Sequence, residues 1–382
     1  MKKFLSNFFL IFLFTYSLPC ISELNTIDNA KVQNKTSEKR RLVKILSIDG
    51  GGVRGIIPAN VLAELERRMS AGENIAEKFD IISGTSAGGI IALMLTAPNN
   101  DGKPKYTASF VATAMSKFSS DVFSRSVWQR IKSGSGWLGE KYDGELLKEK
   151  LKDYFHDLKL SQALTNVIVP TYEIAQDKTF FFKSSRAIKE LPQDCDMRAL
   201  AYATAAAPTY FSPAQLVDGT KKRTLTLIDG GVAANNPTLA AAVYAVELYG
   251  RDIDLFIVSL GTGTSYGAQT NKLEYRNVKN IGKLGWAEHI VPLLMYAGNA
   301  VTDYEMYYVL NFNKPQYYFR IQTVLEPKNS EMDNVDPKNL EALQQYSSKL
   351  IKQYDKELTY IAKVLSNGYF PHPEEKNRQA FR

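Results

Sequence analysis

The sequence predicts an α/β fold in which helices cover a mostly parallel sheet. Two observations carry this prediction. Apolar strand-like runs that end in glycine clusters alternate with segments of helical periodicity. The chain is also long, with 382 residues of which 45% are hydrophobic and 23% charged, so it can bury a large core. No internal repeat and no linker divides that core, and we expect one catalytic domain.

The first strand is expected at Leu42–Ile48, where Asp49–Gly52 interrupts a buried apolar run. Apolar residues then recur at helical spacing, at Ile56, Leu62, Leu65 and Met69. A second strand, Phe79–Ser83, ends in Gly84–Gly88, and a helix follows from about Gly89. Strand, helix, strand and helix in this order are typical of a parallel sheet.

The remaining elements follow from the same patterns. Strands are predicted at Asn166–Ala175, Lys178–Lys183, Leu225–Ile228, Leu255–Gly263 and Tyr317–Ile321. The alanine-rich segment Ala199–Ala207 predicts a helix. Asp336 and Pro337 predict the start of one long helix that continues to about Leu365.

The N-terminus predicts an export signal. Lys2 and Lys3 precede the apolar run Phe8–Phe14, which is shorter than the roughly 20 residues that a spanning helix needs. We expect cleavage near Ser22 and a secreted or periplasmic protein; an uncleaved signal anchor remains an alternative. The expected organisation is a signal peptide at 1–22, a flexible polar leader at 23–41, the catalytic domain at 42–365 and a C-terminal tail at 366–382.

Charge and cysteine content exclude some classes of protein. The formal charge of +7 is modest and is explained as ordinary solubility charge, so we expect no nucleic-acid partner. Cleavage of the signal would remove Cys20 and leave Cys195 alone, which argues against a disulfide framework. With three histidines and one remaining cysteine, the chain is expected to hold no metal and no cofactor.

The first glycine cluster, Asp49–Gly55, predicts an anion cradle. Its glycines let the backbone turn several N–H groups toward one point at the start of a helix. Gly50, Gly52 and Gly55 also satisfy the G-x-G-x-x-G pattern of dinucleotide-binding proteins. That alternative needs an acidic residue at the end of the next strand, whereas Asp80 lies at its start. We therefore do not favour it.

The second cluster is the G-x-S-x-G sequence formed by Gly84, Ser86 and Gly88. A nucleophile on a strand-to-helix elbow is held in strained geometry, and its neighbours two residues away must be small. The alternative is a serine that caps the helix N-terminus. The strand before it and the helix after it favour the nucleophile.

The third cluster, Asp229-Gly230-Gly231, supplies a carboxylate at another strand end. A serine hydroxyl needs a base, and neither downstream histidine is well placed: His289 lies in a predicted helix and His372 in a proline-flanked tail. Asp229 could act as the base directly if burial raised its pKa. The alternative is an ordinary turn aspartate.

Together and in this order, "DGGGVRG", "GTSAG" and "DGG" resemble the motifs of the patatin-like phospholipase family of lipid acyl hydrolases. Other stretches are similar to landmarks of that family: "KYDGELLKEKL", "ATAAAPTYFSP", "NNP" at Asn235–Pro237 and "SLGTG". The resemblance covers roughly Leu42–Leu365. Asp-Gly-Gly in place of Asp-Gly-Ala at the third motif is an accepted variant.

This resemblance implies a three-layer α/β/α sandwich and a Ser-Asp dyad, with Ser86 as nucleophile and Asp229 as proton acceptor. It implies an oxyanion hole contributed by Gly50, Gly51, Gly52 and Arg54. The implied reaction is phospholipase A-type cleavage of glycerophospholipid acyl esters through an acyl-enzyme intermediate. Acyl transfer or hydrolysis of other esters by the same dyad is the alternative, and a non-catalytic storage or lipid-binding protein is less favoured.

Two segments are candidates for contact with lipid. Trp128 and Trp137 lie among basic, glycine and serine residues, which suits peripheral contact with a membrane surface, although a loop with inward-facing tryptophans explains them as well. The apolar stretch 286–301 could line an acyl groove or simply form core. The sequence leaves open whether an activator protein is required.

Overall fold

The computed structural model describes residues 40–124, 140–189, 194–217, 220, 222–265, 275, 279–280, 282, 285–286, 289–311 and 317–368. From Arg41 onward they belong to one compact unit. The predicted signal peptide, most of the leader, the segment with Trp128 and Trp137, and the tail with His372 lie outside the described residues.

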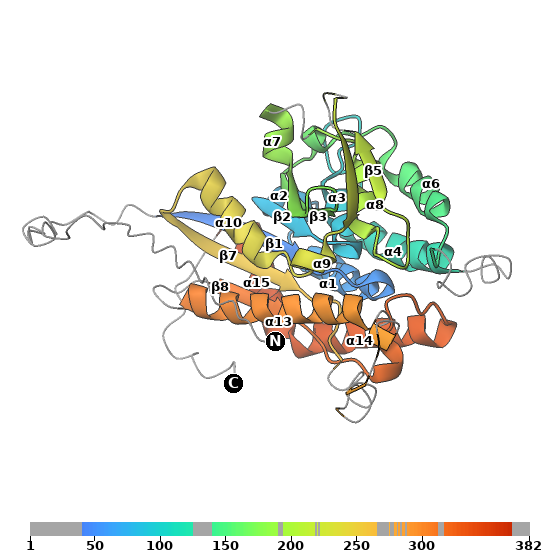
Figure 1. Ribbon diagram of the computed structural model, residues 1–382. Coiled ribbons are helices and arrows are strands. Elements are labelled where there is room, and N and C mark those ends of the chain that lie inside the picture. Colours follow the sequence, from blue (N-terminus) through green and yellow to red (C-terminus); the bar gives the residue numbers. More distant parts are fainter. Residues whose placement is uncertain are drawn as a thin grey trace, which may run out of the picture. The chain divides into compact units, whose positions relative to one another are not determined.

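The core of this unit is a mixed, mostly parallel sheet with strand order β5-β6-β3-β2-β1-β7-β8 and with β4 paired to β3 (Figure 1). Its strands are β1 (Arg41–Ile48), β2 (Ile81–Gly84), β3 (Asn166–Glu173), β4 (Lys178–Lys183), β5 (Ala214–Val217), β6 (Thr224–Asp229), β7 (Ile253–Leu260) and β8 (Tyr317–Ile321). Pairs among β3, β2, β1, β7 and β8 are parallel; the pairs β3–β4, β3–β6 and β5–β6 are antiparallel.

Helices cover both faces of the sheet. They are α1 (Ile56–Arg68), α2 (Ile75–Lys78), α3 (Ala87–Thr96), α4 (Ala108–Phe123), α6 (Gly144–Phe155), α7 (Ser184–Lys189), α8 (Met197–Ala205), α9 (Gly231–Ala234), α10 (Thr238–Tyr249), α13 (Ile290–Asn311), α14 (Pro337–Gln353) and α15 (Asp355–Asn367), with short 3₁₀ helices η1 (Gly52–Gly55), η3 (Leu160–Gln162) and η5 (Pro327–Asn329). Within the described residues, none of them has the length and hydropathy to cross a membrane.

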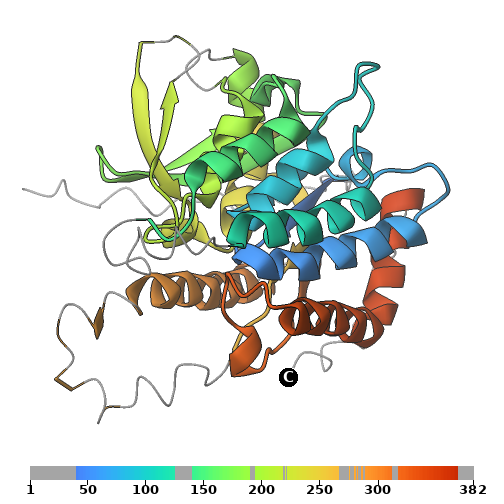
Figure 2. The same cartoon turned by 90° about the vertical axis from the view of Figure 1, so that its right-hand side faces the viewer.

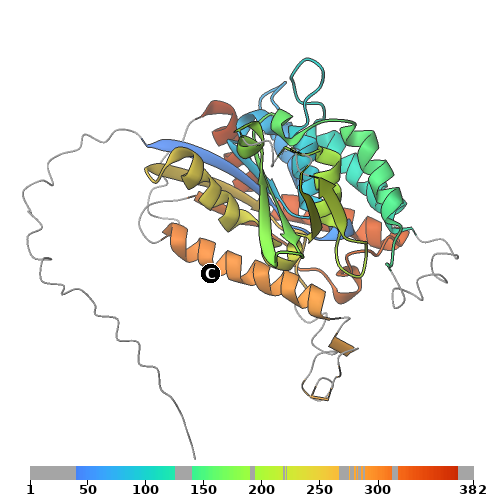
Figure 3. The same cartoon turned by 45° about the horizontal axis from the view of Figure 1, so that its top comes forward.

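Alternation along β1 divides the core into two layers. Val43 and Ile45 face the layer made with α10 and α13, whereas Ile48 faces the larger layer made with α1, α3, α4, α8, α14 and α15. Figure 2 shows α1 and α4 side by side in the larger layer, and Figure 3 shows α10 next to α13. The predicted three-layer α/β/α architecture is therefore confirmed.

One local prediction was wrong, and one strand was not predicted. The single helix expected from Pro337 to about Leu365 is two helices that meet at Tyr354, where φ is −102° and ψ is 28°. Both helices pack against α1, so the change of direction lets each bury its own apolar side. The apolar spacing continues across the junction and does not mark it. Strand β5 was not expected, because only four residues alternate at this sheet edge.

The ends of β2 and β6 meet along one edge of β3. Ile168 pairs with both Ser83 of β2 and Lys183 of β4, while Thr171 pairs with both Asp229 of β6 and Phe180 of β4. Because a strand has two edges, β2 and β6 share the edge opposite β4. They run toward one another, β2 parallel and β6 antiparallel to β3, so their C-terminal ends face each other.

Candidate active site

Ser86 occupies a strained elbow between β2 and α3. Its φ of 56° and ψ of −124° are unusual for a residue with a side chain. A Cβ on Gly84 would lie 2.0 Å from the carbonyl oxygen of Gly88, and one on Gly88 would lie 2.3 Å from the carbonyl oxygen of Ile48. The close approach therefore requires glycine on both sides of the serine.

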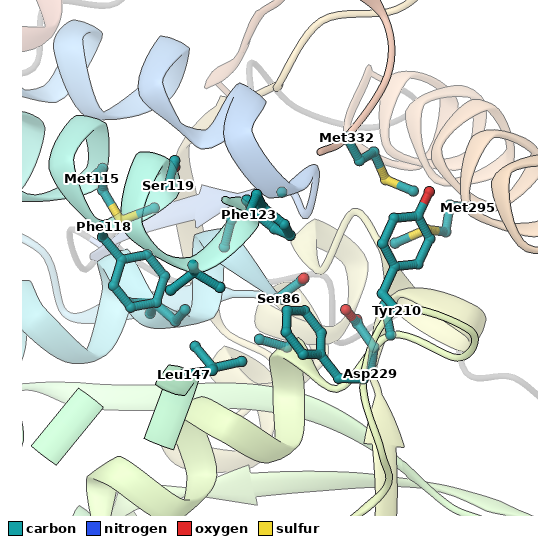
Figure 4. A pocket seen from close by; sticks show the side chains of 17 residues that line it. Ser86, Met115, Phe118, Ser119, Phe123, Leu147, Tyr210, Asp229, Met295 and Met332 are labelled. Carbon is teal, nitrogen blue, oxygen red and sulfur yellow. The ribbon is translucent and has the colours of Figure 1, made fainter. Parts of the chain in front are cut away.

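The side chain of Ser86 does not cap the helix that follows. Ser86 stands at the N-cap position of α3, yet its side chain makes no capping hydrogen bond. Its backbone N–H donates to Thr204 Oγ1 at 3.0 Å, which fixes the elbow to α8. The hydroxyl points instead toward Asp229 (Figure 4). This geometry would allow Asp229 to accept a proton from the Ser86 hydroxyl.

Asp229 ends β6 and is 1% exposed. Oδ1 accepts a 2.7 Å hydrogen bond from the Gly231 N–H, and Oδ2 is buried without a well-aligned partner among the described residues. Burial raises the pKa of Asp229 to about 7, while the nearby Ser86 hydroxyl and the hydrogen bond from Gly231 lower it. A carboxylate with such a pKa can accept a proton near neutral pH.

The glycine loop presents two N–H groups beside the serine. Neither the Gly51 nor the Gly52 N–H donates a hydrogen bond to another described residue. Gly52 has a φ of 58°, and a Cβ there would lie 2.1 Å from the Met332 carbonyl oxygen. Because Gly52 lines the pocket that contains Ser86, its amide can serve as a donor to an oxyanion, and the amide of Gly51, the preceding residue of the same loop, is the second candidate donor.

Gly50 and Arg54, which were grouped with the expected oxyanion hole, have donors that are engaged elsewhere in the loop. The Gly50 N–H is already used, since it donates to the Asn235 carbonyl at 3.1 Å. Arg54 is buried and does not line the pocket; it donates to the carbonyl oxygens of Gly51 (3.2 Å) and Gly263 (3.3 Å). Arg54 therefore holds the glycine loop in place through these carbonyl oxygens, on the side away from the pocket.

Three residues that hold the site were not identified from the sequence: Thr204, Asn235 and Thr262. Thr262 Oγ1 donates to the Gly50 carbonyl at 2.7 Å, and Asn235 Nδ2 contacts the same oxygen at 3.4 Å. All three lie in stretches noted for their resemblance to a known family. Their roles depend on which loops meet in space, which their spacing in the chain does not reveal.

An apolar pocket extends from the dyad. It encloses about 540 Å³, part of it open to solvent. Its apolar walls are Ala87, Ile90, Met115, Phe118, Val122, Phe123, Leu147, Ala205, Ala207, Phe211, Met295 and Met332 (Figure 4). Among the described residues, helix α4 supplies more of this wall than any other helix, and from the expected stretch 286–301 only Met295 takes part. The pocket suits a hydrocarbon chain attached to a reacting carbonyl.

No described histidine lines this pocket, so the described residues form no Ser-His-Asp arrangement. His156 is exposed at the end of α6, and His289 lies half-buried just before α13. Asp80, which was considered as the acidic residue of a dinucleotide-binding site, lies at the start of β2 and donates no group to the pocket; its side chain accepts a hydrogen bond from Arg41. Among the described residues there is also no cluster of histidine, cysteine and acidic side chains able to hold a metal ion.

Comparison with known proteins agrees with this geometry. The family model "Patatin-like phospholipase" matches residues 46–242. Patatin-like protein 4 of Arabidopsis thaliana is 32% identical over 83% of this chain and 85% of its own, and Patatin-like protein 2 of the same plant is 35% identical over 82% and 83%. Patatin group J-1 of Solanum tuberosum is 32% identical over 85% and 90%.

Among solved structures, the crystal structure of VipD from Legionella pneumophila matches 82% of this chain and 67% of that chain. The identity is 14% and the TM-score 0.36, which is too distant to add to the argument. The family model and the plant relatives suffice: the chain belongs to the patatin-like phospholipase family.

Proposed function

We propose that the protein is a phospholipase A-type hydrolase that cleaves fatty-acyl esters of glycerophospholipids with Ser86 and Asp229. Membership of the patatin-like family supports a lipid acyl hydrolase or phospholipase-type function. The observation that carries the specific proposal is the strained Ser86 facing a buried Asp229 at one end of an apolar pocket.

In the first half of the reaction, Ser86 Oγ attacks the ester carbonyl while Asp229 accepts the hydroxyl proton. The Gly51 and Gly52 N–H groups donate to the oxyanion that forms, and one such donor is typically worth about 3–4 kcal/mol of transition-state stabilisation. Collapse of the tetrahedral intermediate breaks the ester C–O bond. Asp229 returns the proton to the departing alcohol, which leaves the acyl group on Ser86.

In the second half, water attacks the acyl-enzyme and gives its proton to Asp229. The same two N–H groups stabilise the second oxyanion, and the fatty acid leaves as the Ser86–acyl bond breaks. Asp229 passes the proton back to Ser86 Oγ. The hydrocarbon chain occupies the pocket beside Met115, Phe118 and Leu147 throughout.

Two alternatives use the same residues differently. If an alcohol replaced water in the second step, the enzyme would be an acyltransferase, and if the alcohol portion were not a phospholipid, it would be a general esterase. A non-catalytic storage or lipid-binding protein has no need of a strained serine, an unpaired carboxylate oxygen and open loop amides together. We therefore place that alternative last.

The proposal is tested by lipid-product mass spectrometry on mixed phospholipid vesicles. The wild-type protein should release free fatty acid and lysophospholipid, whereas Ser86→Ala should lower turnover by about 10⁴-fold or more and keep the same melting temperature. Added alcohols distinguish transfer from hydrolysis by the products that appear. Near-normal turnover in Ser86→Ala would reject the assignment.

We further propose that the protein is exported through residues 1–22 and acts at a membrane surface as a peripheral protein. The N-terminal sequence supports the first part, and the substrate class supports the second. Sequencing the N-terminus of the mature protein tests export, since a start near residue 23 is expected. Full activity of the purified chain on pure vesicles would show that no activator protein is required.

A further inference from the structure

Helix α13 carries an exposed apolar stripe. Ile290, Leu294, Val301, Tyr304 and Tyr308 are between 44% and 66% exposed and recur at three-, four- and seven-residue spacing, so they lie on one side of the helix. Seven of the sixteen exposed large apolar side chains in the described part of the chain lie on this helix. Val243 and Val246 of the adjoining α10 are exposed as well.

The opposite side of α13 contacts two of the three glycine clusters, directly or through residues that hold them. Met295 lines the pocket, and a Cβ on Gly231 would lie 2.4 Å from its terminal methyl carbon. Tyr296 accepts a 2.8 Å hydrogen bond from Arg54, and Asn299 accepts a 3.0 Å hydrogen bond from Asn235. One helix thus supports the Asp229 turn and the glycine loop at the same time.

A fourth contact extends this support to the start of the glycine loop. Asp303 of α13 accepts hydrogen bonds from Asn236 (2.8 Å) and from Arg320 Nε (3.3 Å). Arg320 also forms a two-point ion pair with Asp49, at 2.6 and 3.0 Å. A displacement of α13 would therefore move both Asp229, the proposed base, and the glycine loop that carries the proposed oxyanion donors.

The outer side of α13 is suited to a lipid surface. The only charged residues of this helix are Asp303, which is engaged inward, and Glu305, so the residues of the stripe itself carry no charge that would orient a protein partner. Tyr304 and Tyr308 lie with ring centroids 4.7 Å apart, and tyrosine is a residue of membrane interfaces. Leu294 of the stripe directly precedes Met295, which lines the pocket.

From these contacts we propose that α13 is the lipid-docking helix of the protein, and that docking of its outer side orders the catalytic loops held by its inner side. The inference rests on the proposed function, because a phospholipid surface is where the substrate resides. It also provides a physical route by which a surface could raise activity: the apolar stripe is buried in lipid while Tyr296, Asn299 and Asp303 fix the loops.

The docking experiment uses Val301→Glu combined with Tyr304→Glu, both in exposed positions outside the catalytic machinery. Binding is measured by flotation with vesicles of phosphatidylcholine and phosphatidylglycerol, in a Ser86→Ala background so that the lipid is not consumed. We expect binding about tenfold weaker or more. The matched control, Ile188→Glu with Val217→Glu, places the same charges on exposed apolar positions of α7 and β5 and should bind as the parent does.

Coupling is measured in the active enzyme with a soluble short-chain ester. Vesicles should raise the wild-type kcat/KM for this ester several-fold, whereas the α13 variant should keep its basal activity within about twofold and show no rise. Asn299→Ala should lose basal activity yet bind vesicles normally, because it acts on the inner side. If vesicles still raised kcat/KM in the α13 variant, the proposed coupling between lipid docking and the catalytic loops would be wrong.

The remaining outcomes separate docking from catalysis. If the wild-type protein hydrolyses the ester but binds no vesicles, the docking proposal fails while the proposed function stands. If it binds vesicles through α13 but Ser86→Ala leaves ester hydrolysis unchanged, the proposed function fails instead. If the α13 variant converts a dimer to a monomer by light scattering without changing vesicle binding, the stripe is an interface between two copies and docking to lipid is rejected.

Discussion

Asp49 and Asp229 are two buried aspartates in closely similar local sequences. Each follows an apolar strand, each precedes two glycines, and their exposures are 0% and 1%. Burial raises the pKa of both, to about 6 for Asp49 and about 7 for Asp229. The difference lies in their partners: Asp49 is held by Arg320 through two contacts, whereas Oδ2 of Asp229 is unpaired and the Ser86 hydroxyl is beside it.

The comparison shows that neither the Asp-Gly-Gly sequence nor burial alone makes a base. A carboxylate committed to a guanidinium stays ionised and holds structure, because both oxygens are already occupied. A carboxylate with one free oxygen and no cation can take a proton from a neighbouring hydroxyl. The contacts of Asp49 therefore support the glycine loop, and the free oxygen of Asp229 is what favours it over Asp49 as the proposed base.

The largest expected effect is on the free energy of unfolding and comes from Asp49. Asp49→Asn should lower the free energy of unfolding by about 3–5 kcal/mol, since it leaves the buried Arg320 without its main counter-charge. Asp303→Asn is the matched control: it removes the second, partly exposed carboxylate of the same arginine and should cost less. Urea denaturation measures both. Equal stability of Asp49→Asn and the wild type would contradict the structural role of Asp49.

A smaller effect is expected in the pH dependence of stability. The folded-state pKa of Asp229 lies above the ordinary aspartate value of 3.8, so the folded chain binds this proton more tightly than the unfolded chain. The stability due to this group is fully present below about pH 4 and is lost as pH rises through about 7. Asp229→Asn does not titrate, so its stability relative to the wild type should increase across this range.

Denaturation of the two proteins at a series of pH values checks this expectation. Taking the difference between them cancels the titration of Asp49, which both proteins share. A difference in unfolding free energy that stays constant from pH 4 to pH 8 would mean that the pKa of Asp229 is not raised in the folded state.

Much of the fold could be predicted from the sequence because its strands are buried apolar runs with clear ends. Tyr317–Ile321 and Lys178–Lys183 were placed at their observed bounds, and β1 and β6 within one residue. The break at Tyr354 could not be predicted, because the apolar spacing of α14 continues into α15. The antiparallel direction of β6 was also not predicted, since a strand's sequence does not reveal the direction of its neighbours.

The candidate reacting residues could be selected from the sequence, but their surroundings could not be predicted. Ser86 and Asp229 lie in glycine-marked turns that local chemistry explains, and the structure brings them together for a reason not foreseen: β2 and β6 converge on β3. The wall formed by Met115 and Phe118 was missed, because a helix that lines a pocket has the same periodicity as one that lines a core. The exposed apolar stripe of α13 was not predicted for the same reason.

The most direct test of the central claim is the rate at which an activated organophosphonate ester labels Ser86, followed by peptide mass spectrometry as a function of pH. The wild-type rate should rise with pH and level off above about 7, and His289→Ala should behave in the same way. Asp229→Asn should be labelled about 10²–10⁴-fold more slowly at pH 8. Unchanged labelling in Asp229→Asn, or its loss in His289→Ala, would contradict the Ser86–Asp229 dyad.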